Sequence, residues 1–240
     1  MTVYRVLMAA VILLLAGVVP FFLKAGWPKK TKKSLLLKMI CSTLFLAVGV
    51  LAIVLSGAFS RYAVWILCGL ACSWLGDFLL HVSGKLHFFL LGLVSFLVAH
   101  IFYVVAFCDA LRRTFPQAGF FNLYECLCIA AVVLFGVAAA RRLEIHPGRA
   151  KLPAFFYMCV LVTMMVKASS LGIRCLIAGL PLCGAAAAVL IVGSLCFVLS
   201  DATLAMLNFG PRKTFPLKCF NIGTYYAAQV LLASTILFFN

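Results

Sequence analysis

The sequence predicts an all-α protein that crosses a membrane as a bundle of eight helices. Hydrophobic residues make up 66% of the 240 residues and only 10% are charged, whereas a soluble domain is roughly 25% charged. The apolar residues fall into stretches that are each close to the ~20 residues a helix needs to cross a bilayer. We therefore expect a single integral membrane domain over residues 1–240, without a soluble part.

The first four predicted spans are separated by short gaps that each hold at least one basic residue. They run over Val3–Leu23, Ser34–Ser56, Ala63–Val82 and Phe88–Cys108. The first apolar stretch, Val6–Leu23, is long enough to span and lacks the small-residue pattern of a cleavage site. We therefore expect it to be a helix of the bundle and not a cleaved signal.

The last four predicted spans are delimited in the same way. They run over Phe120–Ala140, Pro153–Leu171, Cys183–Leu207 and Pro216–Phe239. The segment Ile177–Asn208 is longer than one span requires. Because Gly179 and Pro181 are typical turn residues, the seventh helix should begin after them.

The distribution of cations predicts the orientation of these helices. Fourteen belong to the first, third, fifth and seventh connections: Lys24, Lys29, Lys30, Lys32, Lys33, Lys38, Lys85, Arg141, Arg142, Arg149, Lys151, Arg212, Lys213 and Lys218. Five belong to the opposite side: Arg5, Arg61, Arg112, Arg113 and Arg174. Cytoplasmic loops are enriched in Lys and Arg, so we expect both termini outside. The membrane would be the plasma membrane of a bacterium or the endoplasmic reticulum of a eukaryote.

The net charge of +15 does not indicate a nucleic-acid partner, because the cations lie in the short gaps that orient membrane helices. The eleven cysteines indicate neither a disulfide framework nor a zinc site. Most of them lie within apolar runs, where small, soft side chains pack well between helices. Cys126 and Cys128 form CxC and not a CxxC pair, so we expect no metal site.

The third and seventh spans share a sequence pattern. When Gly69–Leu80 is placed over Gly193–Leu204, five of twelve positions are identical, and Asp77 meets Asp201. Spans four helices apart run in the same direction, so the pattern indicates a possible parallel repeat of spans 3–4 and 7–8. Both segments carry small residues spaced i, i+3 and i+7, which let helices approach closely. We therefore expect the third and seventh helices to pack together.

Two of the five acidic residues lie inside apolar spans. Placing Asp77 or Asp201 in a membrane costs about 3 kcal/mol or more, which indicates a function. Both lie near the predicted cytoplasmic ends of their helices, at a depth of about 8–9 Å. Two carboxyls in one low-dielectric pocket cannot both ionise easily, and an acid beside a carboxylate can carry out acid–base catalysis. We expect Asp109, Glu125 and Glu144 to be solvated charges in or near loops.

Polar side chains on neighbouring spans are candidates to join the two aspartates. His100 and Tyr103, at i and i+3, share a face of the fourth span. Tyr225, Tyr226 and Gln229 cluster in the eighth span. Because these spans directly follow the aspartate-bearing ones through short loops, we expect their side chains to lie near the aspartates.

Three further polar side chains lie within or at the ends of spans. Tyr157 lies near the aspartates' end of the sixth span and should line their pocket. Lys167 lies near the opposite end and should extend to the far interface, instead of forming a Schiff base beside the aspartates. His81 is four residues after Asp77, but its place at the helix end predicts that it faces the headgroups.

Motifs in four spans carry a family resemblance by their order and spacing. They are Gly76-Asp77, Ala99-His100 with Tyr103, Leu199-Ser200-Asp201 with Leu204-Ala205, and Thr224-Tyr225-Tyr226-Ala227-Ala228-Gln229. Together they resemble the lysoplasmalogenase family of YhhN-like membrane proteins; His81 is not part of that pattern. The resemblance implies hydrolysis of the vinyl ether bond of a lysoplasmalogen to a fatty aldehyde and a glycerophospho-ethanolamine or -choline. It also adds Ser200 to the candidate supporting residues.

This reaction suits a carboxylic acid that protonates the alkene carbon and a carboxylate that stabilises the resulting cation and activates water. It requires no metal or organic cofactor. The expected partners are a lysophospholipid and membrane lipids, with Lys85, Arg212 and Lys213 as candidate phosphate ligands. The alternative is a proton-coupled transporter of a small molecule or lipid, since intramembrane acids and a parallel repeat also suit transport. The position of both aspartates toward one face favours the enzyme.

Overall fold

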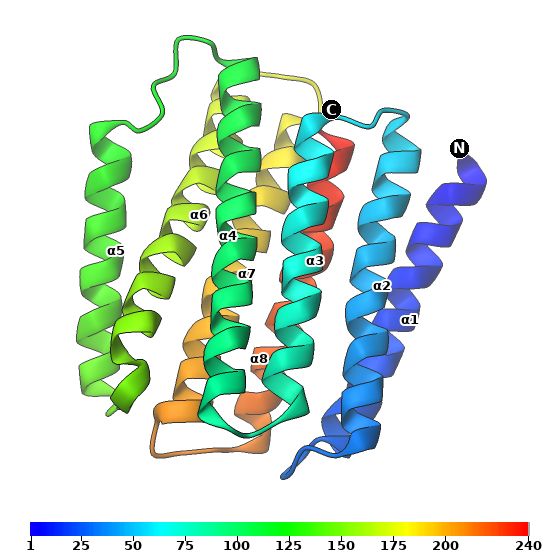
Figure 1. Ribbon diagram of the computed structural model, residues 1–240. Coiled ribbons are helices and arrows are strands. Elements are labelled where there is room, and N and C mark those ends of the chain that lie inside the picture. The colour runs from blue at the N-terminus through cyan, green and yellow to red at the C-terminus, as the bar shows by residue number, and fades with distance from the viewer. Residues whose placement is uncertain (240) are drawn as a thin grey trace.

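The apolar stretches of the sequence form eight α-helices in the computed structural model, which describes residues 1–239 (Figure 1). The helices are α1 (Thr2–Ala25), α2 (Lys32–Ser56), α3 (Arg61–Val82), α4 (Leu86–Thr114), α5 (Leu123–Arg142), α6 (Lys151–Ile177), α7 (Cys183–Phe209) and α8 (Phe215–Ser234). Two short 3-10 helices, η1 (Gly148–Ala150) and η2 (Thr235–Leu237), adjoin α6 and α8. Residues 1–239 contain no strand, so the predicted all-α class is confirmed.

Seven of these eight helices are long and apolar enough to cross a membrane, which makes the chain a multi-pass membrane protein. The exception is α8, which is less apolar than the others because it carries polar residues toward the interior. Asn221 is only 3% exposed and Gln229 is fully buried. The polar residues of α8 therefore belong to the inside of the bundle and not to a water-facing surface.

The small residues of α3 and α7 serve a different contact from the one predicted. Within residues 1–239, α3 packs closely on α4 and α7 packs closely on α8, but α3 and α7 do not pack against each other. A Cβ atom added at Gly69 would lie 2.3 Å from the Tyr103 ring, and one at Gly193 would lie 3.0 Å from Leu231. Small residues permit a close approach but do not select the partner helix, and the short loops bring the next helix in the chain into contact.

The α3–α4 and α7–α8 hairpins have equivalent positions in the chain and turn at the same end of the bundle (Figure 1). The α1–α2 and α5–α6 connections lie at that end too, and both termini lie at the other. The odd-numbered connections, with most of the cations, therefore share one end, as eight consecutive crossings require. Which side of the membrane this end faces is still a prediction.

A buried ion pair at the opposite end of the bundle corrects two predictions. Glu125 lies in the first turn of α5, is fully buried, and has its Oε2 atom 2.7 Å from Nζ of Lys167 on α6. The Lys167 ammonium also donates to the carbonyl of Phe120 and lies 4.1 Å from the ring centroid of Phe121. Glu125 is therefore not a solvated charge, and Lys167 does not extend to the interface. Glu125 faces α6 because it caps the start of α5 with Asn122.

Candidate active site

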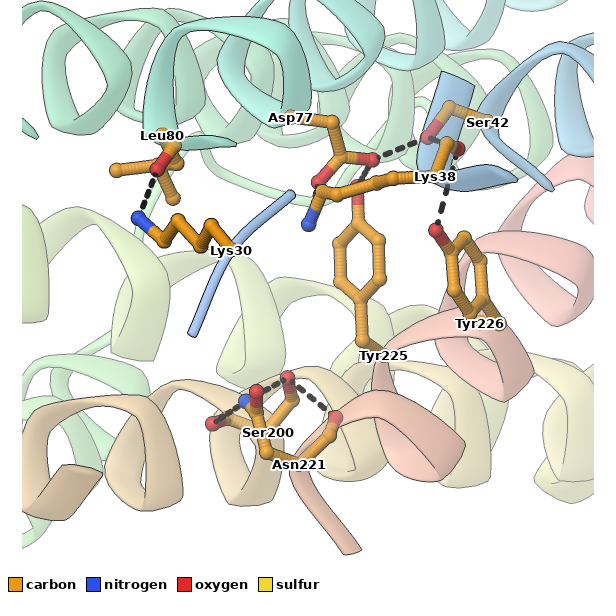
Figure 2. A network of polar contacts seen from close by, with 9 residues as sticks. All are labelled: Lys30, Lys38, Ser42, Asp77, Leu80, Ser200, Asn221, Tyr225 and Tyr226. Carbon is orange, nitrogen blue, oxygen red and sulfur yellow. Dashed lines mark hydrogen bonds and ion pairs between the residues drawn. The ribbon is translucent and has the colours of Figure 1, made fainter. Parts of the chain in front are cut away.

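The carboxyl group of Asp77 is enclosed by donors from two other helices (Figure 2). Asp77 lies near the end of α3 and is 1% exposed. Its Oδ1 atom is 2.8 Å from Nζ of Lys38, and its Oδ2 atom accepts hydrogen bonds from Ser42 Oγ at 2.6 Å and Tyr225 Oη at 2.7 Å. Because one donor is a cation and two are hydroxyls, this arrangement suits an ionised carboxylate.

Lys38 is one of the site residues that the sequence interpretation missed, because it was counted among the loop cations. It lies in the second turn of α2 and is 7% exposed. Its ammonium group lies 5.7 Å from the ring centroid of Phe22 and 5.6 Å from that of Tyr225. A signal was present: Lys38 falls inside the predicted span Ser34–Ser56, between Leu37 and Met39. A cation there needs a partner for the same reason that Asp77 does.

Asp201 has a different environment from Asp77. It lies on α7, and its Oδ2 atom accepts a hydrogen bond from the hydroxyl of Tyr157 on α6. The structure thus brings Tyr157 to the aspartates' end as expected. Within residues 1–239, no Lys, Arg or His nitrogen lies within ion-pair distance of the Asp201 carboxyl.

Asp77 and Asp201 line one cavity of about 270 Å³. Its walls come from the α1–α2 and α7–α8 connections, the helix ends beside them, the end of α3, and the facing part of α4. Apolar side chains such as Phe89, Phe96 and Leu204 line it together with polar ones. The aspartates therefore share a cavity at the end of the bundle that holds the odd-numbered connections, although their helices do not pack together.

Hydrogen bonds attach α8 to α7, which carries Asp201, and to α2, which carries Lys38. Ser200 Oγ donates to the carbonyl of Asn221 at 3.1 Å, and Asn221 Nδ2 donates to the carbonyl of Ser200 at 2.8 Å (Figure 2). Tyr226 Oη donates to the carbonyl of Lys38 at 3.5 Å. Ser200 and Tyr226 thus lie at the site, and Asn221 is a further polar residue that no motif had singled out.

The remaining predicted side chains form a second buried layer. Tyr103 donates to Oε1 of Gln229 at 3.1 Å, joining α4 to α8. His100 is fully buried, with Nδ1 2.6 Å from the carbonyl of Phe96 and its ring centroid 5.3 Å from that of Tyr157. His100 contacts the tyrosine that bonds Asp201, but it does not itself bond either aspartate.

His81 does not face the headgroups as predicted. It is 8% exposed, Nε2 lies 2.7 Å from Ser34 Oγ on α2, and its ring lies beside Phe22 of α1. The two helices that precede α3 cover this position, so the end of α3 is enclosed by protein and not by the interface. His81 also lines the cavity.

Cations at the cavity differ from those proposed from the sequence. Lys213 lines the cavity, whereas Lys85 and Arg212 are not among its lining residues. Lys30 and Lys218 line it in addition to Lys38. Their positions depend on how the α1–α2 and α7–α8 connections fold toward one another, which hydropathy does not reveal.

The fold and the site define a multi-pass helical membrane protein with two aspartates in a cavity near one end of its bundle. The chain matches the model of the YhhN family over residues 33–236 and belongs to that family, which includes lysoplasmalogenases. The resemblance seen in the motifs is thereby confirmed. No curated protein and no solved structure matches the chain.

Proposed function

We propose that the protein hydrolyses the vinyl ether bond of a lysoplasmalogen, producing a fatty aldehyde and a glycerophospho-ethanolamine or -choline. Membership of the YhhN family supports a lysoplasmalogenase-like activity. The observation that carries the proposal is the shared cavity of Asp77 and Asp201, in which the first carboxyl is paired with a cation and the second is not. Two carboxyls in different environments are suited to different roles.

The reaction begins with proton transfer to the alkene carbon that is remote from the ether oxygen. The proton forms a new C–H bond, the π electrons move, and an oxocarbenium ion results. Water then adds to this cation and loses a proton to a carboxylate, which gives a hemiacetal. The hemiacetal hydroxyl then loses its proton as the carbonyl forms, the C–O bond to the glycerol breaks, the glycerol oxygen takes a proton, and the aldehyde leaves. The net reaction consumes one water, and the proposal includes neither metal nor organic cofactor.

Asp201 is the better candidate for the acid. Asp201 is half-buried in a cavity with apolar walls, where a carboxylate without a counter-charge is costly and a protonated carboxyl avoids that cost. Tyr157 donates to one oxygen of Asp201, which leaves the other oxygen to carry the proton. Asp201 would then return to the acid form when it recovers a proton during hydration of the cation.

Asp77 is the better candidate for the carboxylate. Its negative charge is held by Lys38, Ser42 and Tyr225, and a carboxylate fixed in a cavity stabilises a developing cation without reorganising. The apolar part of the cavity wall, which includes Phe89 and Leu204, suits the alkenyl chain of a lysophospholipid in the surrounding bilayer.

The test is aldehyde release from a lysoplasmalogen by the purified, chelator-treated protein. We expect turnover, and none on the matched lysolipid with a saturated ether chain, because that chain has no alkene to protonate. Absence of turnover together with solute movement across reconstituted vesicles would favour the proton-coupled transporter instead.

A further inference from the structure

The cavity holds more positive than negative charge. Four lysines and two aspartates line it: Lys30, Lys38, Lys213, Lys218, Asp77 and Asp201. The Lys38–Asp77 ion pair cancels one charge of each sign. Within residues 1–239, none of the other three lysines lies within ion-pair distance of a carboxylate. With the four lysines and both aspartates counted as charged, the lining carries two positive charges in excess in a cavity of about 270 Å³.

These three lysines reach the cavity from separate segments. Lys30 comes from the α1–α2 connection, Lys213 from the α7–α8 connection, and Lys218 from the first turn of α8. Nζ of Lys30 donates to the carbonyl of Leu80 at the end of α3, at 2.6 Å (Figure 2). That bond holds the Lys30 ammonium at the edge of the cavity, although the residue is partly exposed.

Bringing like charges together is unfavourable unless an anion joins them. Burial of the Lys30 ammonium, and to a lesser extent the charge of Lys38, lowers the pKa of Lys30. The mouth of the cavity thus has an electrostatic cost in the absence of a ligand. A cavity lined by several cations is suited to an anionic group with several acceptor oxygens.

We infer that Lys30, Lys213 and Lys218 form a site for a phosphate ester at the mouth of the cavity. Ammonium groups bind phosphate oxygens through charge-assisted hydrogen bonds. The identity of the ligand, a lysolipid that carries the phosphate, rests on the proposed function. Its glycerol backbone separates the phosphate from the vinyl ether by three carbons, so a phosphate at the mouth leaves the vinyl ether toward the deeper aspartates.

Binding of a lipid that cannot react tests this site apart from catalysis. The ligand is a saturated 1-O-alkyl lysophospholipid, the comparison ligand is the 1-O-alkylglycerol that lacks the phosphate, and the protein is the full chain in nanodiscs. We expect the Lys30→Gln/Lys213→Gln/Lys218→Gln variant to bind the phospholipid about tenfold or more weakly, because it loses charge-assisted hydrogen bonds to the phosphate. Its affinity for the alkylglycerol should be unchanged.

The matched control removes three cations from the same end of the bundle. Lys29, Lys32 and Lys33 are exposed and do not line the cavity. The Lys29→Gln/Lys32→Gln/Lys33→Gln variant should bind the phospholipid as the native protein does, and thermal unfolding should show both variants folded. Equal weakening by both variants, or by neither, would overturn the phosphate site.

Two further measurements distinguish the phosphate-ester site from a site for free phosphate and from the proposed reaction. Inorganic phosphate should compete only weakly with the lysophospholipid, because it lacks the chain. If inorganic phosphate displaced the lysophospholipid at an equal concentration, and the triple Gln variant lost this effect, free phosphate would be the ligand. That result would overturn the lipid assignment. Lysine-dependent lipid binding without aldehyde release would overturn the proposed reaction and leave the site. Aldehyde release from alkenylglycerol and from the phospholipid at equal KM would overturn the site and leave the reaction.

Discussion

The surroundings of the two aspartates differ because of individual side chains on their neighbouring helices. Lys38 and Ser42 are four residues apart on α2, so they present one cation and one hydroxyl on the same face toward Asp77. Asp201 receives one hydroxyl, from Tyr157. The proposed division into carboxylate and acid thus follows from what α2 and α6 place opposite each aspartate.

Replacing Asp201 with Asn should abolish most aldehyde release while the protein still folds. Asn retains the size of the side chain and can still accept the hydrogen bond from Tyr157, but it cannot donate a proton to carbon. We expect a loss of about 100-fold or more in kcat, the usual range for removing a general acid. The measurements are turnover and thermal unfolding. Near-native turnover in folded Asp201→Asn would remove this residue from the mechanism.

Replacing Asp77 requires a second change, because Asp77→Asn alone leaves the buried ammonium of Lys38 without a carboxylate. Such a charge destabilises a protein by about 3–5 kcal/mol. The pair Lys38→Met/Asp77→Asn should recover most of this stability and still lack activity. Adding Asp201→Asn to the pair should lower the activity little further, because residues that act together are not additive. Activity that returns with stability in the Lys38→Met/Asp77→Asn protein would give Asp77 a structural role only.

Among the helices, α5 depends on a single neighbour. Within residues 1–239 its main contact is with α6, it lies at one edge of the bundle in Figure 1, and most of its residues are exposed to the surroundings of the bundle. The Glu125–Lys167 ion pair is fully buried in this contact. We infer that this pair determines how α5 docks on α6.

Breaking the α5–α6 ion pair should destabilise the protein more than removing it. Glu125→Gln leaves the Lys167 ammonium buried without its carboxylate and should cost about 3–5 kcal/mol, whereas Glu125→Leu/Lys167→Met should be close to native stability. The matched control is Asp109→Asn. It breaks the partly exposed Asp109–Arg113 pair on α4 and should cost only about 0.3–0.5 kcal/mol.

Equilibrium unfolding in detergent micelles measures all three variants. Because the pair lies at the end of the bundle opposite the cavity, the double variant should keep its aldehyde release. Equal stability of Glu125→Gln and Asp109→Asn would contradict the inferred role of the pair in docking α5.

At the scale of the whole molecule, hydropathy predicted the helices and the end of the bundle at which the aspartates lie, but not the arrangement of helices around the bundle axis. The end at which a residue lies follows from its position along a span, and Asp77 and Asp201 do line one cavity. Contact between spans depends on which faces meet. The pattern of small residues in α3 and α7 was therefore assigned to the wrong pair of helices, and the pairing of Lys38 with Asp77 was missed.

The orientation of the bundle in the membrane is the remaining prediction at this scale. The cation-rich end holds the cavity and the α1–α2 and α7–α8 connections, so the predominance of basic residues there predicts that the cavity opens to the cytoplasm.

Single cysteines at Lys32 and Gln117, both exposed and at opposite ends of the bundle, test this in a background without other cysteines. In intact cells or sealed vesicles of known sidedness, a membrane-impermeant thiol reagent should label Gln117→Cys from the non-cytoplasmic side. Lys32→Cys should react only after permeabilisation, because the cations of its connection hold that end on the cytoplasmic side. Labelling in the reverse pattern would place the cavity on the non-cytoplasmic side, and the lysophospholipid would then have to come from that leaflet.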